Sequence, residues 1–489
     1  MSNQALPTIP SEYMHPELMT IGDSLAQGCR SLTNIAAFCK QSWSARIANA
    51  QGWQFRIPDF PRPILYDLEQ EVRLLGDLIQ VAPSEIRFQG MIGRFLQNLR
   101  AWLSNHRESK SLCFDNLGLV GAQPYDLYTR TAATSGAKIA AICPNGTGTS
   151  SVKTGDIGTL HLAINGRFVL NPSQDPNFAD MTPIKWVRAR LPKRLFVQIG
   201  HNNGLYSIGA DADPAKLNFT QKNENGDDFF DSFRIIAEAL ASLPGEIQSI
   251  AVVLLPKVGA APNLMPTDNG RQDGYAENYA PTFSISKTLL SGTALAEVDV
   301  QIAAANERIK QIFTTAAQAS NQVGRLKFLD TFALFEGIDY KNTLDSTRRI
   351  VIDPRQSIDN DYIKGGLIPQ PPFPPGEPPF RKLINRGGFG SVDGMHPTAC
   401  GYAVVASRMM DLLGLPNNDL SKLLEQSFMD DALLHDFPLK LDLIISILVE
   451  LRRALRIGAS PVQPQQILLE GGTEPHLIDI IDFARQLFR

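Results

Sequence analysis

Short apolar runs that alternate with helical patterns constrain the fold of this 489-residue chain most strongly. Runs typical of buried strands lie at 18–21, 194–200, 247–255 and 326–330. Helical periodicity is present at 68–78, 93–103, 228–241, 298–316 and 401–413. This alternation predicts an α/β fold with a parallel, doubly wound sheet. Such sheets bind ligands at the carboxyl ends of their strands, so residues that follow the strands are the first candidates for a functional site.

Composition narrows the class of protein. Hydrophobic residues make up 43% and charged residues 20% of the chain, so a sizeable core can be buried. The net charge of -4 argues against a nucleic-acid partner. The odd number of cysteines and the lack of a Cys-x-x-Cys pair predict buried free thiols, with no disulfide framework and no zinc cluster. The cysteines are Cys29, Cys39, Cys113, Cys143 and Cys400.

Neither a secretory signal nor a membrane span is expected. The first residues lack the basic start and apolar stretch of a signal peptide. The strongest apolar run, 441–451, is interrupted by Asp442 and Glu450 and is shorter than the roughly 20 residues needed to cross a bilayer. We therefore expect a cytoplasmic protein.

Ser24 occupies the turn between the first expected strand and the helix that follows, in the sequence Gly22-Asp23-Ser24-Leu25. A fold can expose a nucleophile at such a turn. A serine hydroxyl is nearly inert at neutral pH, so the chain must also supply a base, an orienting carboxylate and donors for an oxyanion. Three later segments can supply these groups.

Two of these segments offer oxyanion donors. In 115–123, Gly121 can present a backbone N–H without a side chain in the way, although a turn of this kind is more often structural. In 196–204, an apolar strand ends at Gly200 and is followed by His201, Asn202 and Asn203. An asparagine here can direct its side-chain amide into the crevice, or can close the strand in an Asx turn. We expect no metal role for His201, because its neighbours lack ligand spacing.

The third segment, 391–398, contains Asp393 and His396. At a spacing of three residues, the carboxylate can bind one imidazole nitrogen and leave the other to accept the serine proton. Taken alone, the same pair is also compatible with ordinary loop residues before a helix. No other histidine has a comparable setting.

The segments at 22–25, 116–121, 200–203 and 393–396 together resemble, in order, the four sequence blocks of the SGNH or GDSL-type hydrolases. This resemblance implies a flavodoxin-like α/β/α sandwich that hydrolyses esters or thioesters without a metal or other cofactor. By position, it implies that Ser24 is the nucleophile and that His396 is the general base held by Asp393. It implies oxyanion donors at Ser24 N–H, Gly121 N–H and the Asn202 side chain.

The chain departs from the family pattern at two points. Asn203 replaces the aspartate of the Gly-x-Asn-Asp block, which puts any bond made by that carboxylate in doubt. The distance along the chain from Ser24 to Asn202 is long, which implies insertions that include 64–106 and 146–170. The expected substrate is a small ester, either a lipid or an acylated carbohydrate.

The domain organisation follows from these matches. We expect a hydrolase domain at 1–415 and a helical extension at 416–489, with helices at 420–428, 439–457 and 477–488. Two stretches, 259–279 and the proline-rich 365–379, are predicted to be long loops. The proline-rich loop could rim a pocket or dock a partner.

Three alternatives stay open to different degrees. An α/β-hydrolase would place its serine in Gly-x-Ser-x-Gly, but Ala26 stands at the final glycine position. A binding or scaffold protein could keep the fold without turnover, although the four intact segments weigh against it. An acyltransferase would use the same acyl-enzyme intermediate, and only product analysis separates it from a hydrolase.

Overall fold

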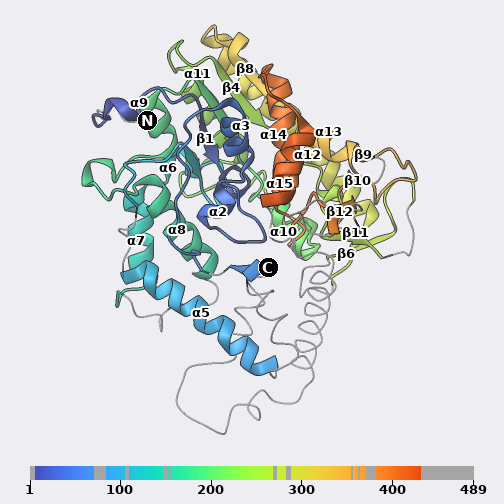
Figure 1. Cartoon of the computed structure of the whole chain (residues 1–489). Helices are drawn as coiled ribbons and strands as arrows, with labels where there is room; N and C mark the ends of the chain where they lie inside the picture. Colours follow the sequence, from blue (N-terminus) through green and yellow to red (C-terminus); the bar gives the residue numbers. More distant parts are fainter. Residues whose placement is uncertain are drawn as a thin grey trace.

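Helices surround a central parallel sheet in the computed structural model of the protein (Figure 1). The structure describes residues 6–430 except 66, 71–83, 105–108, 147–151, 153–155, 268–271, 282–287, 354–355, 362–363, 370–379 and 392. Among the described residues, no helix is both long and apolar enough to cross a lipid bilayer.

The central sheet has five parallel strands in the order β2-β1-β3-β4-β8. The strands are β1 (Met19–Gly22), β2 (Asn116–Gly118), β3 (Arg194–Gln198), β4 (Ser249–Val253) and β8 (Leu326–Leu329). All four predicted strands are confirmed. The pattern missed β2, because its three residues include a polar Asn116 and a glycine and lack an apolar run.

The helices confirm most of the helical predictions. They are α1 (Ser24–Gln27), α2 (Ala36–Cys39), α3 (Trp43–Gln51), α5 (Ser84–Ser104), α6 (Asp126–Thr129), α7 (Ala132–Ile142), α8 (Ile157–Leu170), α9 (Pro183–Arg190), α10 (Leu205–Asp211), α11 (Phe229–Ala241), α12 (Gly292–Ala319), α13 (Thr331–Gly337), α14 (Ala399–Leu413) and α15 (Leu420–Asp430). Residues 71–78 of the expected helix at 68–78 lie outside the described residues.

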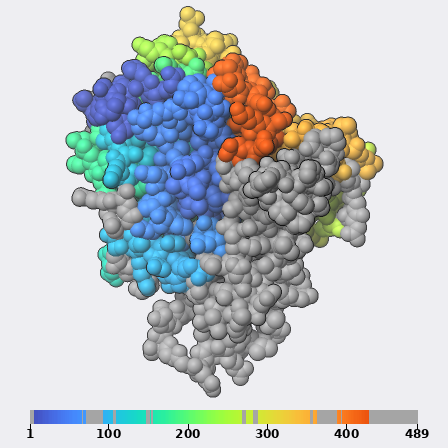
Figure 2. Space-filling model, in the orientation of Figure 1, coloured from blue at the N-terminus to red at the C-terminus, as the bar shows by residue number. Residues whose placement is uncertain are grey.

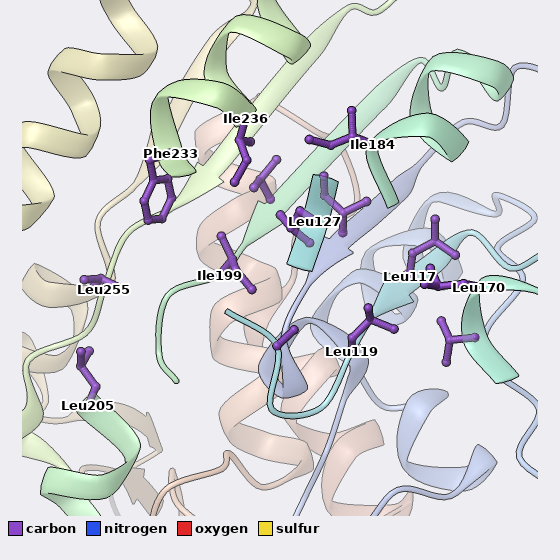
Figure 3. Packing of buried hydrophobic residues seen from close by; sticks show 14 of the residues in the cluster. Leu117, Leu119, Leu127, Leu170, Ile184, Ile199, Leu205, Phe233, Ile236 and Leu255 are labelled. Atoms are coloured by element: carbon purple, nitrogen blue, oxygen red, sulfur yellow. The ribbon is translucent and has the colours of Figure 1, made fainter. Parts of the chain in front are cut away.

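Both faces of the sheet are buried, which places helices on either side. Along β3, Leu195 and Val197 point into one apolar cluster and Phe196 points into another. The first cluster joins the sheet to α8, α9, α11 and α12, and Figure 3 shows part of it around Ile199 and Ile236. The second joins the sheet to α3 and α14. The strand alternation therefore explains the layered α/β architecture.

Segments from the two ends of the described chain meet on one face. The ring of Trp43 in α3 stacks on Phe196, with ring centroids 4.9 Å apart. Helix α15 packs on α14 and buries Leu424, so the first expected helix of the C-terminal extension is confirmed. Figure 2 shows α14 and α15, in orange, beside the N-terminal segments in blue. The helices predicted at 439–457 and 477–488 lie outside the described residues.

Small antiparallel sheets correct the two loop predictions in part. Strands β5 (Leu264–Pro266), β6 (Asn278–Pro281) and β7 (Leu290–Ser291) form one sheet, so 259–279 is not loop throughout. Strand β11 (Lys364–Pro369) pairs with β12 (Phe380–Arg386), and β9 (Ile350–Asp353) pairs with β10 (Gln356–Ile358). The start of the predicted proline-rich loop is therefore a strand, and 370–379 lies outside the described residues. Strands β5, β6, β7, β9 and β10 are only two to four residues long, which is too short for a clear alternating pattern.

Gly118, at the end of β2, allows two backbone segments to approach closely. A Cβ atom at this position would lie 2.4 Å from the backbone nitrogen of Gln27 and 2.8 Å from the carbonyl oxygen of Asp23. We expect Gly118→Ala to lower the free energy of unfolding by about 2–3 kcal/mol, because the backbone must shift. Urea unfolding followed by circular dichroism measures this change.

Gly136→Ala is the matched control. Gly136 lies inside α7, and nothing lies within 4 Å of a Cβ atom there. We expect this substitution to leave stability unchanged or to raise it by up to about 1 kcal/mol. Equal losses in the two variants would contradict the close-approach argument.

Candidate functional site

Ser24 is the first residue of α1 and directly follows the turn out of β1. At Gly22 a Cβ atom would lie 1.9 Å from the carbonyl oxygen of Gln198, so glycine lets β1 end this close to β3. Asp23 caps α1, because its Oδ1 accepts a hydrogen bond from Leu25 N at 3.1 Å. The turn thus holds Ser24 at the carboxyl edge of the sheet.

His396 and Asp393 reach Ser24 from the loop before α14. His396 Nε2 lies 3.0 Å from Ser24 Oγ, and Nδ1 lies 2.5 Å from Asp393 Oδ2. The carboxylate favours the tautomer with its proton on Nδ1, which leaves Nε2 to accept the Ser24 hydroxyl. The structure therefore brings Ser24, His396 and Asp393 into one hydrogen-bonded chain.

The carboxylate of Asp393 is buried and fully surrounded by donors. Its Oδ1 accepts from Ser391 Oγ, Met395 N and His396 N at 3.1, 3.0 and 2.9 Å. Its Oδ2 accepts from Leu32 N at 3.1 Å and contacts the imidazole of His396. Burial alone would raise the pKa of Asp393, but His396 and the backbone N–H groups hold that pKa below its ordinary value. Asp393 therefore stays ionised beside the imidazole.

The surroundings of His396 favour its protonated form. Burial acts to lower the pKa of His396, but the neighbouring Cys29 sulfur and the Asp393 carboxylate together raise it well above 6.5. The ring of Tyr206 lies beside the imidazole, with centroids 5.9 Å apart. His161, from α8, is different: burial and the nearby His396 lower its pKa to about 4, so it is neutral near pH 7.

Asn202 follows β3 and lines the same hollow as Ser24 and His396. One hydrogen of its amide is already used, because Nδ2 donates to the carbonyl oxygen of Ala122 at 2.9 Å. An amide nitrogen carries a second hydrogen, which leaves one donor for a ligand. The bond to Ala122 also fixes the orientation of the amide.

Gly121 lies in the turn after β2, in the left-handed region with φ of 78°. The turn is tied to the site at both ends, since Leu119 N donates to Gly22 O at 2.9 Å and Ala122 O accepts from Asn202. Gly121 itself is exposed, and it is not among the residues that line the hollow. The structure brings its turn to the site without placing Gly121 in hydrogen-bond contact with Ser24.

A buried amide network supports this arrangement, and sequence reasoning did not find it. Gln27 of α1 donates to Gly118 O at 2.5 Å and accepts from Asn34 and Asn165 at 2.5 and 3.1 Å. Asn165 in α8 also accepts from Val120 N at 3.2 Å. The network ties α1 to the turn that holds Gly121. No sequence motif marks these amides, because their partners lie far apart along the chain.

His201 also has a structural contact that the sequence did not predict. Its Nδ1 lies 2.7 Å from Oδ2 of Asp23, and both residues are buried. The pair joins the turn after β1 to the turn after β3. One feature of the sequence could have indicated this contact: Asp23 and His201 each follow an expected strand. These two strands, β1 and β3, are neighbours in the sheet.

Ser24 opens onto a largely apolar hollow. It contains about 800 Å³ of space free of protein atoms, counting its open mouth. Its walls include Leu205, Val258, Phe335, Phe389 and Met395. The one lysine in its lining, Lys257, is balanced by nearby carboxylates: Asp339 at 3.4 Å and Glu336 at 4.0 Å. The hollow therefore suits an uncharged, apolar group.

The charge of Asp393 should control the titration of His396. We expect His396 to keep its proton above pH 6.5 in the unaltered protein. Asp393→Asn should lower its pKa, because the imidazolium loses its counter-ion. Imidazole chemical shifts measured across pH by nuclear magnetic resonance report both values. His161, which should stay neutral down to about pH 5, is the internal control. A pKa of His396 that does not move in Asp393→Asn would contradict this assignment.

Comparisons with known proteins do not identify the chain. No protein-family model matches it, and searches of curated proteins and of solved structures find no match either. Within the described residues, no group of three His, Cys, Asp or Glu side chains is arranged to hold a metal ion.

Proposed function

We propose that the protein is a serine hydrolase that cleaves carboxylic esters or thioesters through an acyl-enzyme intermediate. The observation that carries this proposal is the hydrogen-bonded chain from Ser24 through His396 to Asp393, which opens onto the apolar hollow. As the space that would take the acyl group, this hollow is called the acyl hollow from here on. A serine, a base and an orienting carboxylate in this order are the minimum set for nucleophilic acyl transfer.

The proposed reaction has two stages. Above the raised pKa of His396, Nε2 is unprotonated and can act as the base. Ser24 Oγ then attacks the ester carbonyl as His396 Nε2 takes its proton, and the departing alcohol takes that proton as the C–O bond breaks. Water next attacks the acyl-enzyme, with His396 again as the base, and releases the acid. Asp393 stays ionised throughout and stabilises the imidazolium in both stages.

The oxyanion formed in each stage needs fixed donors. The free amide hydrogen of Asn202 and the backbone N–H of Ser24 are suited to this role, because Ser24 begins a helix and Asn202 shares the hollow. We assign Gly121 N–H as the third donor, following the family resemblance. Substrate binding would have to bring this turn against the carbonyl oxygen.

We further propose that the chain belongs to the SGNH hydrolases with a flavodoxin-like sandwich. In chain order the five parallel strands read 2-1-3-4-5 across the sheet, which is the flavodoxin-like order. Ser24 and Asn202 follow β1 and β3, the neighbouring strands at the point where the order reverses. Asn203 stands where the family has aspartate, and its amide nitrogen donates to Asn218 O at 3.3 Å.

The cysteines support a reducing location for this proposed enzyme. All five are free and buried, as the sequence predicted. Such cysteines suit the cytoplasm, where thiols stay reduced.

Substitutions in the hydrogen-bonded chain should abolish ester cleavage. We expect hydrolysis of 4-nitrophenyl acetate by the purified protein, and its loss in Ser24→Ala and His396→Ala. Asp393→Asn should lower kcat about 10⁴-fold through the wrong imidazole tautomer. Asn202→Ala should lower kcat about 10²- to 10³-fold through the lost oxyanion donor.

Ser44→Ala is the matched control for Ser24→Ala. Ser44 is a buried serine in α3, and its hydroxyl has no hydrogen-bond partner in the described part of the chain. The variant should keep the activity and the circular dichroism spectrum of the unaltered protein. Equal turnover by Ser24→Ala and the unaltered protein would overturn the proposed function.

A further inference from the structure

A second hollow adjoins the proposed site, and it is polar. It lies between the turn at 123–125, Asn203 and the segment 218–232, and we call it the polar cleft. It contains about 670 Å³ of space free of protein atoms, again counting its mouth. The proposed mechanism uses none of its lining residues.

The segment Asn202–Asn203 borders both the acyl hollow and the polar cleft. Asn202 lines the acyl hollow, and the next residue, Asn203, lines the polar cleft. Gln123, on the opposite wall of the cleft, donates from Nε2 to the carbonyl oxygen of Asn202 at 3.2 Å. The two spaces therefore have neighbouring residues of one segment in their walls.

Asn203 leaves a buried acceptor in the cleft lining. The residue is 7% exposed, and its Nδ2 donates to Asn218 O at 3.3 Å. Its Oδ1 is buried and has no hydrogen-bond partner among the described residues. A buried carbonyl oxygen without a donor costs free energy, which a bound hydroxyl group would recover. Asn203 is also the residue that departs from the family pattern.

The remaining lining fits a hydroxylated, uncharged ligand. Gln123, Gln221 and Asn223 present amides, which can donate to and accept from hydroxyl groups. Tyr125 and Phe229 add aromatic surface. A ligand rich in both hydroxyl groups and C–H faces, such as a sugar, can use both kinds of contact.

Charge argues against an anionic ligand in the cleft. The lining includes three carboxylates, Glu224, Asp227 and Asp228, and one lysine, Lys222. Phosphate or sulfate groups would meet a net negative surface. An uncharged polyol avoids this repulsion and can donate hydroxyl hydrogens to the carboxylates.

We propose that the polar cleft binds the alcohol part of the substrate and that this alcohol is a polyhydroxylated, uncharged group of the sugar type. The acyl chain occupies the acyl hollow. This inference rests on the proposed ester hydrolysis. The bond broken is the ester C–O bond, and the sugar hydroxyl leaves into the cleft with the proton from His396.

Two esters with the same acyl group test the proposal. We would compare kcat/KM for glucose 6-octanoate and ethyl octanoate, with Ser24→Ala as the blank. The unaltered protein should prefer the sugar ester by at least about 10-fold. Asn203→Leu and Gln221→Leu should each reduce that preference at least about 10-fold, because the site then leaves sugar hydroxyls unpaired. Asn203→Asp keeps an acceptor and should retain most of the preference.

The control is Asn225→Leu, which changes an exposed residue of the same segment that does not line the cleft. It should leave the ratio of the two kcat/KM values unchanged. Equal kcat/KM for both esters, or a ratio that neither cleft variant moves, would overturn the inference while the proposed function stands. No Ser24-dependent cleavage of either ester would overturn both.

Discussion

The buried carboxylate of Asp393 is the group on which the candidate site depends. It accepts hydrogen bonds from Ser391, Leu32, Met395 and His396, and those donors come from two segments at opposite ends of the described chain. Burying a carboxylate costs free energy unless hydrogen-bond donors surround it. The ionised Asp393 therefore depends on these donors. The same contacts bring the loop before α14 against the segment after α1. They therefore hold the imidazole at Ser24.

The parallel sheet explains why the other parts of the site converge. β1, β2 and β3 are neighbours and run in the same direction, so their carboxyl ends share one edge. The turns that follow these strands carry Ser24, Gly121 and Asn202, and the buried Gln27 network and the Asp23–His201 pair lock the turns together. Asn202 lines the acyl hollow, and the next residue, Asn203, lines the polar cleft. In our account, the acyl part of the ester binds in the acyl hollow and the alcohol part binds in the polar cleft.

Sequence patterns predicted the parts of the structure that have a local signature. Four of the five strands of the central sheet are apolar runs, so their positions could be predicted. Asp393 and His396 could be recognised as a pair because they are three residues apart. Strand β2 was not predicted, because it has only three residues, which include a polar Asn116 and a glycine. Its place in the sheet depends on pairing with β1 rather than on its own residues. The His201 contact and the amide network depend on tertiary packing between distant segments. The small antiparallel sheets were missed because most of their strands have only two to four residues. The polar cleft is likewise assembled from separate loops.

Mass spectrometry of the acyl-enzyme tests the central claim most directly. The protein would be mixed with an activated ester, quenched in acid within the first turnover and digested. Our account predicts one added acyl group on the peptide that contains Ser24, assigned to that residue by fragmentation and absent from Ser24→Ala. Ester turnover with the acyl group on another residue, such as the nearby Cys29, or with no adduct under conditions that slow deacylation, would contradict it.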